Sequence, residues 1–582
     1  MASLLNIATL SARTFQRALD VTSHNIANVN TEGYNRQRVE IVANAPQTSG
    51  ASSYGRGSRI DSIERVYADY IWRQQLQATS LYQRYDGALA NAKSVEGVIA
   101  ANDGGVQTFL QRFYDSLHNL ANEPLSNVNR QMLLDEATNL ESHIQNITTF
   151  LNDHQTQANA QINSLVDSIN EQLDVIQRAN DAVFRARDQG TFPPNDLLDQ
   201  REQAIMKLGE LIDVRTFEQP NGHIDVYIGN GKLPLLSDNT RVPITAERSP
   251  YTDENRTEVY LQISGQKRVV SDLISGGQLG GVLDYRKNML DPAQRELGLA
   301  LNGFVNSFNL QHKQGWDLNG NVGGDFFQNL NAQSIAHRDN TETDGSLITV
   351  QFATPANSTL PNGLFDEIAL YQPRDYRLQY DAGIGAFRVY DHETGAPIQD
   401  SSGADITIAP GSSQVVDGLE VSVATGGYAD GDRFILKPHE QMLQDFRRVL
   451  DDPNAIATRG EDPNNSGNPA GDGDNTNVAN LANLASRPLL YADAAGQPSE
   501  TILGGYSRMA SNVGLYTYGV QISLDAQQNV LDQVTQRREA LSGVNLDEEA
   551  ANLMRYQQAY QAAAQMIQVS NTLFDTLIGV IR

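Results

Sequence analysis

The sequence predicts a mainly α-helical protein with an inserted β domain (α+β), in which an elongated helical rod carries coiled-coil helices formed by both ends of the chain. Three observations predict this fold. Both ends repeat apolar residues at alternating spacings of three and four. Residues 106–189 contain no glycine, whereas residues 330–437 show strand patterns punctuated by glycine and proline. At 582 residues, the chain is long enough for roughly two to four domains.

The first and last helices are expected to pair in a terminal coiled-coil core domain, residues 1–35 and 545–582. A sustained apolar period of 3.5 residues is typical of coiled coils. Both segments are poor in charge, which favours helices enclosed by other protein over helices with a solvated face. The side chains predicted to form this assembly interface are Leu5, Ala8, Ala12, Phe15, Leu19, Ile26 and Val29 at the start of the chain, and Leu546, Leu553, Tyr560, Ile567, Phe574, Ile578 and Ile581 at its end.

Residues 36–329 and 438–544 are assigned to a helical rod domain. Apolar heptads predict one helix of roughly 60 residues over 126–188, well above the average helix length. Further helices are expected over about 62–100, 106–122 and 278–313. A small β-hairpin region is expected around 214–275, because "HIDVYIG" and "TEVYLQISG" alternate apolar and polar residues and Asn221-Gly222 favours a hairpin turn.

Residues 330–437 are predicted to form a separate outer β domain inserted within the rod. Its strand patterns are "AFRVYD", "ADITIAP", "GLEVSVA" and "DRFILKP". The polar segment Glu461–Asn477 is expected to be a linker or an exposed loop. This nested order brings both chain ends together at the far end of the rod.

Composition narrows the class of protein. A net charge of −27 argues against a nucleic acid or an anionic membrane surface as the partner. There is no cysteine, and therefore no disulfide framework or thiolate site. No stretch approaches the ~20 apolar residues of a membrane span, and the segment "MASLLNIATLSARTFQR" lacks the basic region of a cleavable secretory signal. We expect either a cytosolic protein or one exported by a route that needs no such signal.

No motif predicts catalysis, a cofactor or a metal. The segment "DHETGA" (Asp391–Ala396) lacks the second histidine of a zinc-protease helix. The segments "DLNGNVGGDFF" and "GDGDNTN" lack the glycine and glutamate that a calcium loop requires at its sixth and twelfth positions. Neither a P-loop nor a G-x-S-x-G motif is present. We therefore expect a protein that is not an enzyme.

The segment "NIANVNTEGYNRQ" (Asn25–Gln37) resembles the N-terminal signature of the bacterial flagellar axial proteins, which comprise the rod, hook and hook-associated proteins. The resemblance is specific, because the Asn-rich motif directly follows a heptad helix. The matching residues are Asn25, Ala27, Asn28, Thr31, Gly33 and Tyr34. The segments "NDLLDQRE" (Asn195–Glu202), "GWDLNG" (Gly315–Gly320) and the C-terminal "SGVNLDEEAANLMRYQQAYQ" are similar to the hook-associated members. The resemblance is weakest in the β insertion and in residues 459–477.

This resemblance implies a structural subunit of the bacterial hook–filament junction that acts in flagellum assembly and cell motility. It implies secretion through the flagellar export channel and assembly outside the cell, in a tube whose inner core is formed by the terminal helices. The implied partners are further copies of the chain, the hook protein, a second junction protein (hook-associated protein 3, FlgL) and an export chaperone that binds the C-terminal segment. No nucleic acid or membrane insertion is implied.

Three alternatives remain open. The chain could be another flagellar axial protein, particularly the hook protein, although its length and its long helix favour a junction protein. It could carry a glycan-hydrolysing enzyme in the β insertion, where Asp366, Glu367, Asp391 and Glu393 offer carboxylates. It could also be a translocator of an injection-type secretion system, but such proteins normally carry an apolar membrane-inserting segment, which is absent from this sequence.

Overall fold

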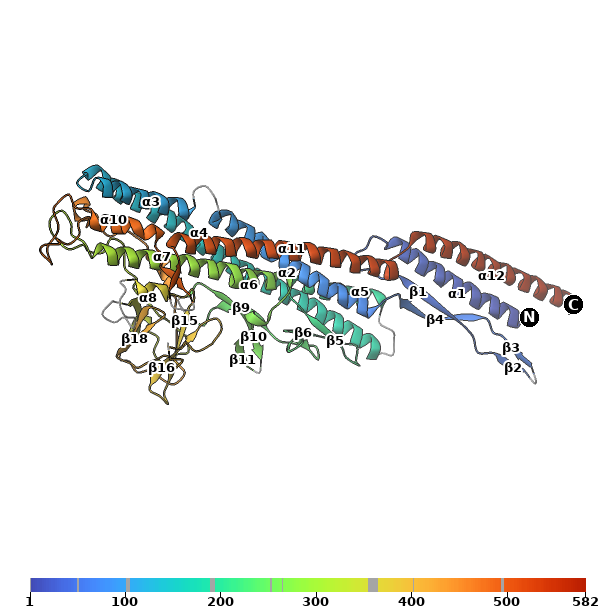
Figure 1. Cartoon of the computed structure of the whole chain (residues 1–582). Coiled ribbons are helices and arrows are strands. Elements are labelled where there is room, and N and C mark those ends of the chain that lie inside the picture. The colour runs from blue at the N-terminus through green and yellow to red at the C-terminus, as the bar shows by residue number, and fades with distance from the viewer. Residues whose placement is uncertain are drawn as a thin grey trace.

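The computed structural model describes residues 2–49, 52–100, 105–188, 194–251, 254–263, 265–353, 365–400, 402–493 and 497–581. Within these ranges the molecule is a long rod whose main helices run along its axis (Figure 1). Both chain ends lie together at one end of the rod, and most of the sheets project from one side (Figure 1). The predicted fold class, an elongated α+β rod with paired terminal helices, is confirmed.

The helices of the described residues account for the length of the rod. Helix α11 packs along α2, α2 along α6, and both α3 and α5 along α4. The α-helices are α1 (Ala2–Ala27), α2 (Asp69–Ile99), α3 (Val106–Asn122), α4 (Asn127–Asp188), α5 (Asn195–Leu211), α6 (Gly277–Tyr285), α7 (Asp291–His312), α8 (Asp366–Ala369), α9 (Pro438–Asp445), α10 (Thr476–Asn483), α11 (Ile502–Ser542) and α12 (Leu546–Ile581). Shorter turns are the 3₁₀ segments η1 (Ser271–Leu273), η3 (Gly345–Leu347), η4 (Pro453–Ala455) and η5 (Leu484–Ser486) and the π-helical η2 (Arg286–Leu290).

Helix α4, with 62 residues, confirms the long helix predicted over 126–188. It continues without a break because it contains neither glycine nor proline. Its apolar heptads pause near the middle of the helix, where the buried side chains are polar. There His154 shares a hydrogen bond with Ser94 (3.1 Å), and Asn159 accepts one from the Thr257 N–H (2.9 Å). The pause therefore marks the place where α2 and a strand are hydrogen-bonded to α4.

The strands of the described residues form small sheets in which the pairs are antiparallel. The strands are β1 (Gln37–Ala43), β2 (Gln47–Ser49), β3 (Ser52–Tyr54), β4 (Ser58–Arg65), β5 (Arg215–Glu218), β6 (Ile224–Ile228), β7 (Leu233–Ser237), β8 (Thr240–Arg241), β9 (Ile244–Arg248), β10 (Thr257–Ile263), β11 (Gln266–Val269), β12 (Ala332–Gln333), β13 (Ile335–Ala336), β14 (Ile348–Phe352), β15 (Tyr376–Asp381), β16 (Ala386–Asp391), β17 (Thr407–Ile408), β18 (Ser412–Val416), β19 (Leu419–Val423), β20 (Arg433–Leu436), β21 (Leu490–Ala492) and β22 (Pro498–Glu500). Their orders are β1-β4, β2-β3, β5-β6-β7-β8, β11-β10-β9, β12-β14-β19-β18, β13-β20-β15-β16-β17 and β21-β22.

The predicted hairpin at Asn221-Gly222 is present and joins β5 to β6, with Gly222 at a positive φ of 90°. The antiparallel ribbon β1–β4, in contrast, is an element that the sequence analysis does not predict. It pairs Gln37 with Arg65 and lies against α1. Its side chains are mostly half-buried or exposed, so its strands lack a strong apolar alternation. The segment that follows the first helix is therefore a ribbon before the rod helices begin.

Two hydrophobic clusters in the described residues form the core. One cluster joins the first half of α4 to α3, α7 and the strands of the β insertion, and includes Phe113, Phe304 and Ile348. The other joins the second half of α4 to α5, α6 and the sheets of the hairpin region, and includes Ile169 and Val259. Strands β12–β20 thus lie where the β domain is predicted, but their core is continuous with that of the rod. The division of the chain into domains stays a prediction.

Candidate assembly site

Helices α1 and α12 pack against each other in antiparallel directions at the end of the rod (Figure 1). Several small side chains of the two helices are fully buried, including Ala8, Ala18 and Ala563. The aromatic pair Phe15–Tyr556 stacks between the two helices, with ring centroids 6.5 Å apart. Small residues allow two helices to approach closely, so the pair buries little apolar surface between its helices.

The large apolar side chains of the two helices lie mainly outside this contact. Phe574, for example, is 55% exposed. An apolar surface of this kind typically marks a protein–protein contact. The exposed large apolar residues of the pair are Leu4, Leu5, Leu10, Leu546, Met554, Tyr560, Met566, Val569, Leu573, Phe574, Leu577 and Ile578.

The predicted interface residues fall into three groups within a single copy of the chain. Ala8 is buried between the helices, while Ala12, Phe15, Leu19, Ile26, Val29, Leu553 and Ile567 are half-buried. Leu5, Leu546, Tyr560, Phe574 and Ile578 are exposed. The side chain of Ile581 lies outside the described residues.

The Asn-rich motif after α1 forms a buried hydrogen-bonded network. The Asn25 amide binds both backbone groups of Gln37: Nδ2 donates to the carbonyl (2.9 Å), and Oδ1 accepts from the N–H (2.9 Å). The same Oδ1 accepts from the Tyr34 hydroxyl (2.8 Å), and Nδ2 also donates to Glu549 of α12 (3.2 Å). Asn25 and Glu549 are only 1% and 2% exposed. The motif therefore ties the end of α1 to the start of both β1 and α12.

A second part of the network reaches the rod. Asn35 donates through Nδ2 to Asp199 of α5 (2.7 Å), and Arg65 at the end of β4 pairs with Asp199 (2.7 Å) and Glu202 (2.8 Å). Burial raises the pKa of Glu202, although Arg65 favours its charged form. On the other side, Arg36 pairs with Glu548 and donates its backbone N–H to the Ser542 carbonyl. We call these contacts, together with those of Asn25, the rod junction.

The remaining motif residues shape the turn. Asn28 donates to the His24 carbonyl (2.9 Å) and accepts from the Thr31 hydroxyl (3.1 Å) at the end of α1. Gly33 has a positive φ of 78°, the conformation expected for it, and Ala27 is the last residue of α1. The sequence identified these residues and the segment 195–202, but it did not indicate that they contact each other.

Known proteins resemble the chain along its whole length. The family model described as the flagellar hook-associated protein FlgK helical domain matches residues 92–327. The models of the flagella basal body rod protein and of the flagellar basal body rod FlgEFG protein C-terminal match residues 5–34 and 536–580. Flagellar hook-associated protein 1 from Salmonella typhimurium is 30% identical over 100% of both chains, and that from Escherichia coli is also 30% identical over 100% of both. The chain belongs to the flagellar hook-associated protein 1 family.

The fold agrees with this membership. The solved structure of the flagellar hook junction protein FlgK from Burkholderia pseudomallei is similar to the chain with a TM-score of 0.67 and 20% identity, covering 81% of this chain and 100% of that one. As a member of the hook-associated protein 1 family, the chain is a structural subunit of the extracellular hook–filament junction of the flagellum. The models at the two ends are shared with the rod family, so the helical-domain model and the full-length relatives distinguish this family from the hook protein.

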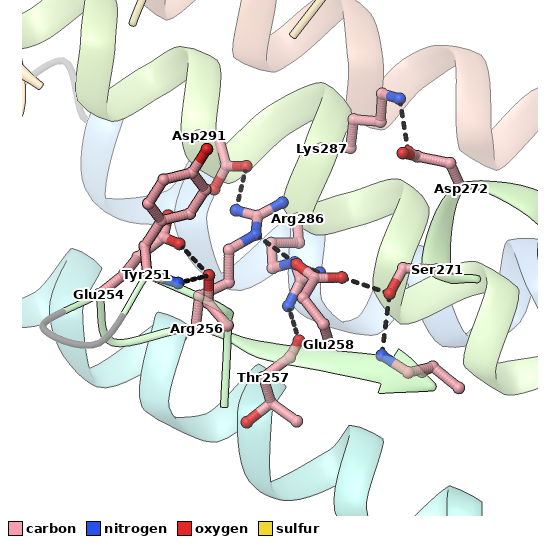
Figure 2. Close-up of polar contacts among 12 residues, drawn as sticks. Tyr251, Glu254, Arg256, Thr257, Glu258, Ser271, Asp272, Arg286, Lys287 and Asp291 are labelled. Carbon is pink, nitrogen blue, oxygen red and sulfur yellow. Dashed lines mark hydrogen bonds and ion pairs between the residues drawn. The ribbon is translucent and has the colours of Figure 1, made fainter. Parts of the chain in front are cut away.

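Outside the assembly site, a cleft of about 500 Å³ lies between the hairpin region, the rod and the β insertion. Arg256 lines the cleft and pairs with Glu258 and Asp291, each at 2.7 Å (Figure 2). Arg286 pairs with the same Glu258 (3.0 Å) and donates to the Thr257 carbonyl (2.5 Å). These contacts hold β10 against η2 and α7.

Further ion pairs in the cleft connect the β insertion to the hairpin region and to α7. Lys437 pairs with Glu254 (2.8 Å), and Arg295 pairs with Glu393 (2.9 Å) and more distantly with Asp375 (3.6 Å). Burial alone would raise the pKa of Glu254, but the adjacent cations, first of all Lys437, lower it to about 2. Ion-pair networks can perturb pKa values without catalysis. Each of these carboxylates is paired with a cation, so the ion pairs of the cleft have the character of a network that holds the fold together.

The four carboxylates considered for a glycan hydrolase are not gathered around one cleft. Only Glu393 lines the cleft described above. Asp391 lies toward Arg374 (3.8 Å), and Asp366 and Glu367 belong to α8. Within the described ranges, no group of three or more His, Cys, Asp or Glu side chains is arranged to hold a metal ion. The same ranges include no helix with the length and apolar character needed to cross a membrane.

Proposed function

We propose that the chain assembles with further copies of itself into a tube through the paired helices α1 and α12, after export through the flagellar channel. In this proposal the hook protein lies on one side of the tube, and the second junction protein, hook-associated protein 3 (FlgL), lies on the other. An export chaperone binds the C-terminal segment before export. The observation that carries the proposal is the exposed apolar surface at the end of α12.

The end of α12 has the properties of a surface that is completed by another subunit. Leu573, Phe574, Leu577 and Ile578 expose between 46% and 55% of their surface in the single chain. Full burial of a side chain of this size is worth roughly 1.5–3 kcal/mol, so covering the exposed half contributes about 1 kcal/mol for each residue. A contact repeated by every subunit multiplies this gain around the tube.

The substitution Phe574→Asp tests the proposal. The melting temperature of the isolated chain should not change, because the ring is already half exposed. Assembly should fail, because the interface would have to bury an unpaired carboxylate, which costs several kcal/mol or forces its protonation. Export should continue, because the unfolded chain does not use the packed surface. The expected phenotype is protein in the culture medium and cells without filaments.

The matched control is Gln565→Asp, which adds the same charge at an exposed polar position of the same helix. It should leave filaments and swimming intact. Normal filaments with Phe574→Asp would refute the assembly role of this surface. A fall of several degrees in the melting temperature would instead assign Phe574 to the core of the single chain.

A further inference from the structure

The rod carries an exposed apolar ridge on α11, away from the terminal helices. Leu515, Tyr518 and Ile522 are 67%, 66% and 50% exposed and follow spacings of three and four along the helix. We call these three residues the α11 ridge. The only charged residues between positions 509 and 536 are Asp525 and Asp532. A narrow apolar seam on a helix that is already packed on its other side is typical of a helix that docks against another protein.

A groove of about 390 Å³ lies on a different side of the rod, between α2 and β5. Its apolar lining includes the buried Leu76 and Val214, and Phe217 on β5 is 50% exposed. We call it the α2–β5 groove. Two polar atoms of its lining, Ser80 Oγ and Arg84 Nε, are buried without a hydrogen-bond partner in the described structure. The exposed ring of Phe217 is an apolar contact that an occupant of the groove could cover.

The ridge and the groove are complementary in size and charge. The α2 wall from Arg73 to Arg84 is about 17 Å long, at 1.5 Å per helical residue. The ridge from Leu515 to Ile522 is about 10 Å long, and the segment that continues to Asp525 is about 15 Å long. Three arginines and a single carboxylate line the groove. Arg73 and Arg84 pair with Asp69 and Asp284 of the same chain, and Arg215 is the third arginine, whereas the charges next to the ridge are both acidic.

The two surfaces lie on opposite sides of α2. Helix α11 packs along one side, where Gln75 and Lys93 of α2 bond to it, and the groove is lined by the other side of α2 and by β5. One copy can therefore use both surfaces at once, each with a different neighbour. A contact between two different surfaces of the same chain repeats from copy to copy and generates a ring or a helical tube.

We propose that the α11 ridge of one copy occupies the α2–β5 groove of the next copy, so that neighbouring rods pack side by side around the tube. This inference rests on the proposed self-assembly and adds a second contact surface, in the rod, to that of the terminal helices. The ridge supplies the apolar side chains, and Arg215 at the groove faces the acidic residues that follow the ridge.

Cysteine cross-linking tests this contact, because the chain has no cysteine of its own. The variants Tyr518→Cys and Phe217→Cys change exposed side chains and leave the core intact. They should be co-expressed in cells that lack the natural protein, and hook–filament junctions should be isolated and oxidised. The expected result is a cross-linked dimer that forms only when both variants are present, since the contact joins unlike surfaces.

The control replaces Phe217→Cys by Val128→Cys, a 74% exposed position at the start of α4. This combination should give no dimer above the background of each variant alone. Three outcomes would overturn the inference. A dimer from Tyr518→Cys alone would show a symmetric contact between ridges. Junctions that contain the protein without the mixed dimer would refute the ridge–groove contact and leave the terminal interface standing. Absence of the folded, exported protein from junctions would refute both proposals.

Discussion

The substitution Asn25→Ala should release α12 from the rod junction. It removes hydrogen bonds to the Gln37 N–H and carbonyl, the Tyr34 hydroxyl and the Glu549 carboxylate, at 2.8–3.2 Å. A hydrogen bond contributes about 1 kcal/mol net, and one to a charged group contributes more. Water can reach the half-buried Gln37 and offset part of the loss. Of these bonds, the one to the Glu549 carboxylate reaches α12, and its loss should cost about 1.5–3 kcal/mol, a shift of roughly 10–10² in the equilibrium between docked and released α12.

Hydrogen exchange followed by mass spectrometry measures this shift directly. Peptides from the start of α12 should exchange roughly ten- to a hundredfold faster in the variant, and peptides from the end of α1, which loses the other bonds, should also exchange faster, while peptides from α4 keep their rates. The matched control is Asn28→Ala, since this amide makes only local contacts with His24 and Thr31. It should cost less than about 1 kcal/mol. Equal acceleration by both substitutions, or unchanged exchange in α12 with Asn25→Ala, would contradict the role assigned to the buried amide.

Three further substitutions test other parts of the molecule. Gly418→Ala should destabilise the β insertion by about 2 kcal/mol or more in urea unfolding, because its φ is +79° and the new Cβ would lie 2.1 Å from the Glu367 carbonyl oxygen. The control Gly403→Ala should cost about 1 kcal/mol, because its φ is also positive, at +83°, but no atom lies within 4 Å of the new Cβ. Glu254 has a folded pKa of about 2 against an ordinary value of 4.5, so its contribution of up to about 3 kcal/mol is present above pH 4.5 and is lost as the pH falls toward 2. Glu254→Gln should therefore flatten the dependence of unfolding free energy on pH in that window, and an unchanged profile would show that the ion pair does not contribute. Arg130→Met should lower the melting temperature by several degrees, because this fully buried side chain donates to three backbone carbonyls and a hydroxyl that would lose their partner. An unchanged melting temperature would mean that water replaces the lost guanidinium contacts.

The sequence predicted the elements whose signal is local. Helix α4 was visible because neither glycine nor proline interrupts its heptads, and the β5–β6 hairpin because Asn221-Gly222 favours one turn geometry. The β1–β4 ribbon was missed because its strands bury little apolar surface of their own. Its stability comes from contacts with α1 and from Arg65, which meets Asp199 across 134 residues of chain. Residue spacing within one segment carries no information about such a distant partner.

The assembly residues show a different limit of periodicity. A heptad identifies the apolar face of a helix but does not state which protein covers it. In the terminal pair, Ala8, Ala18 and Ala563 fill the contact within the chain, while larger residues such as Phe574 face outward. The seam predicted from the sequence therefore combines side chains that belong to the fold of one copy with side chains that remain available to another.

The small residues between α1 and α12 have a consequence for the timing of assembly. Alanine and serine bury little surface per helical turn, so the pair is held most firmly where the rod junction anchors it and most weakly at the two chain ends. Because the contact weakens toward the chain ends, the two helices should separate first at those ends and re-form from the rod junction outward. In the proposed tube, a newly arrived subunit would therefore present loose helix ends to the neighbours already in position. A free subunit would have to order these ends without neighbours, which is costly and disfavours polymerisation in solution.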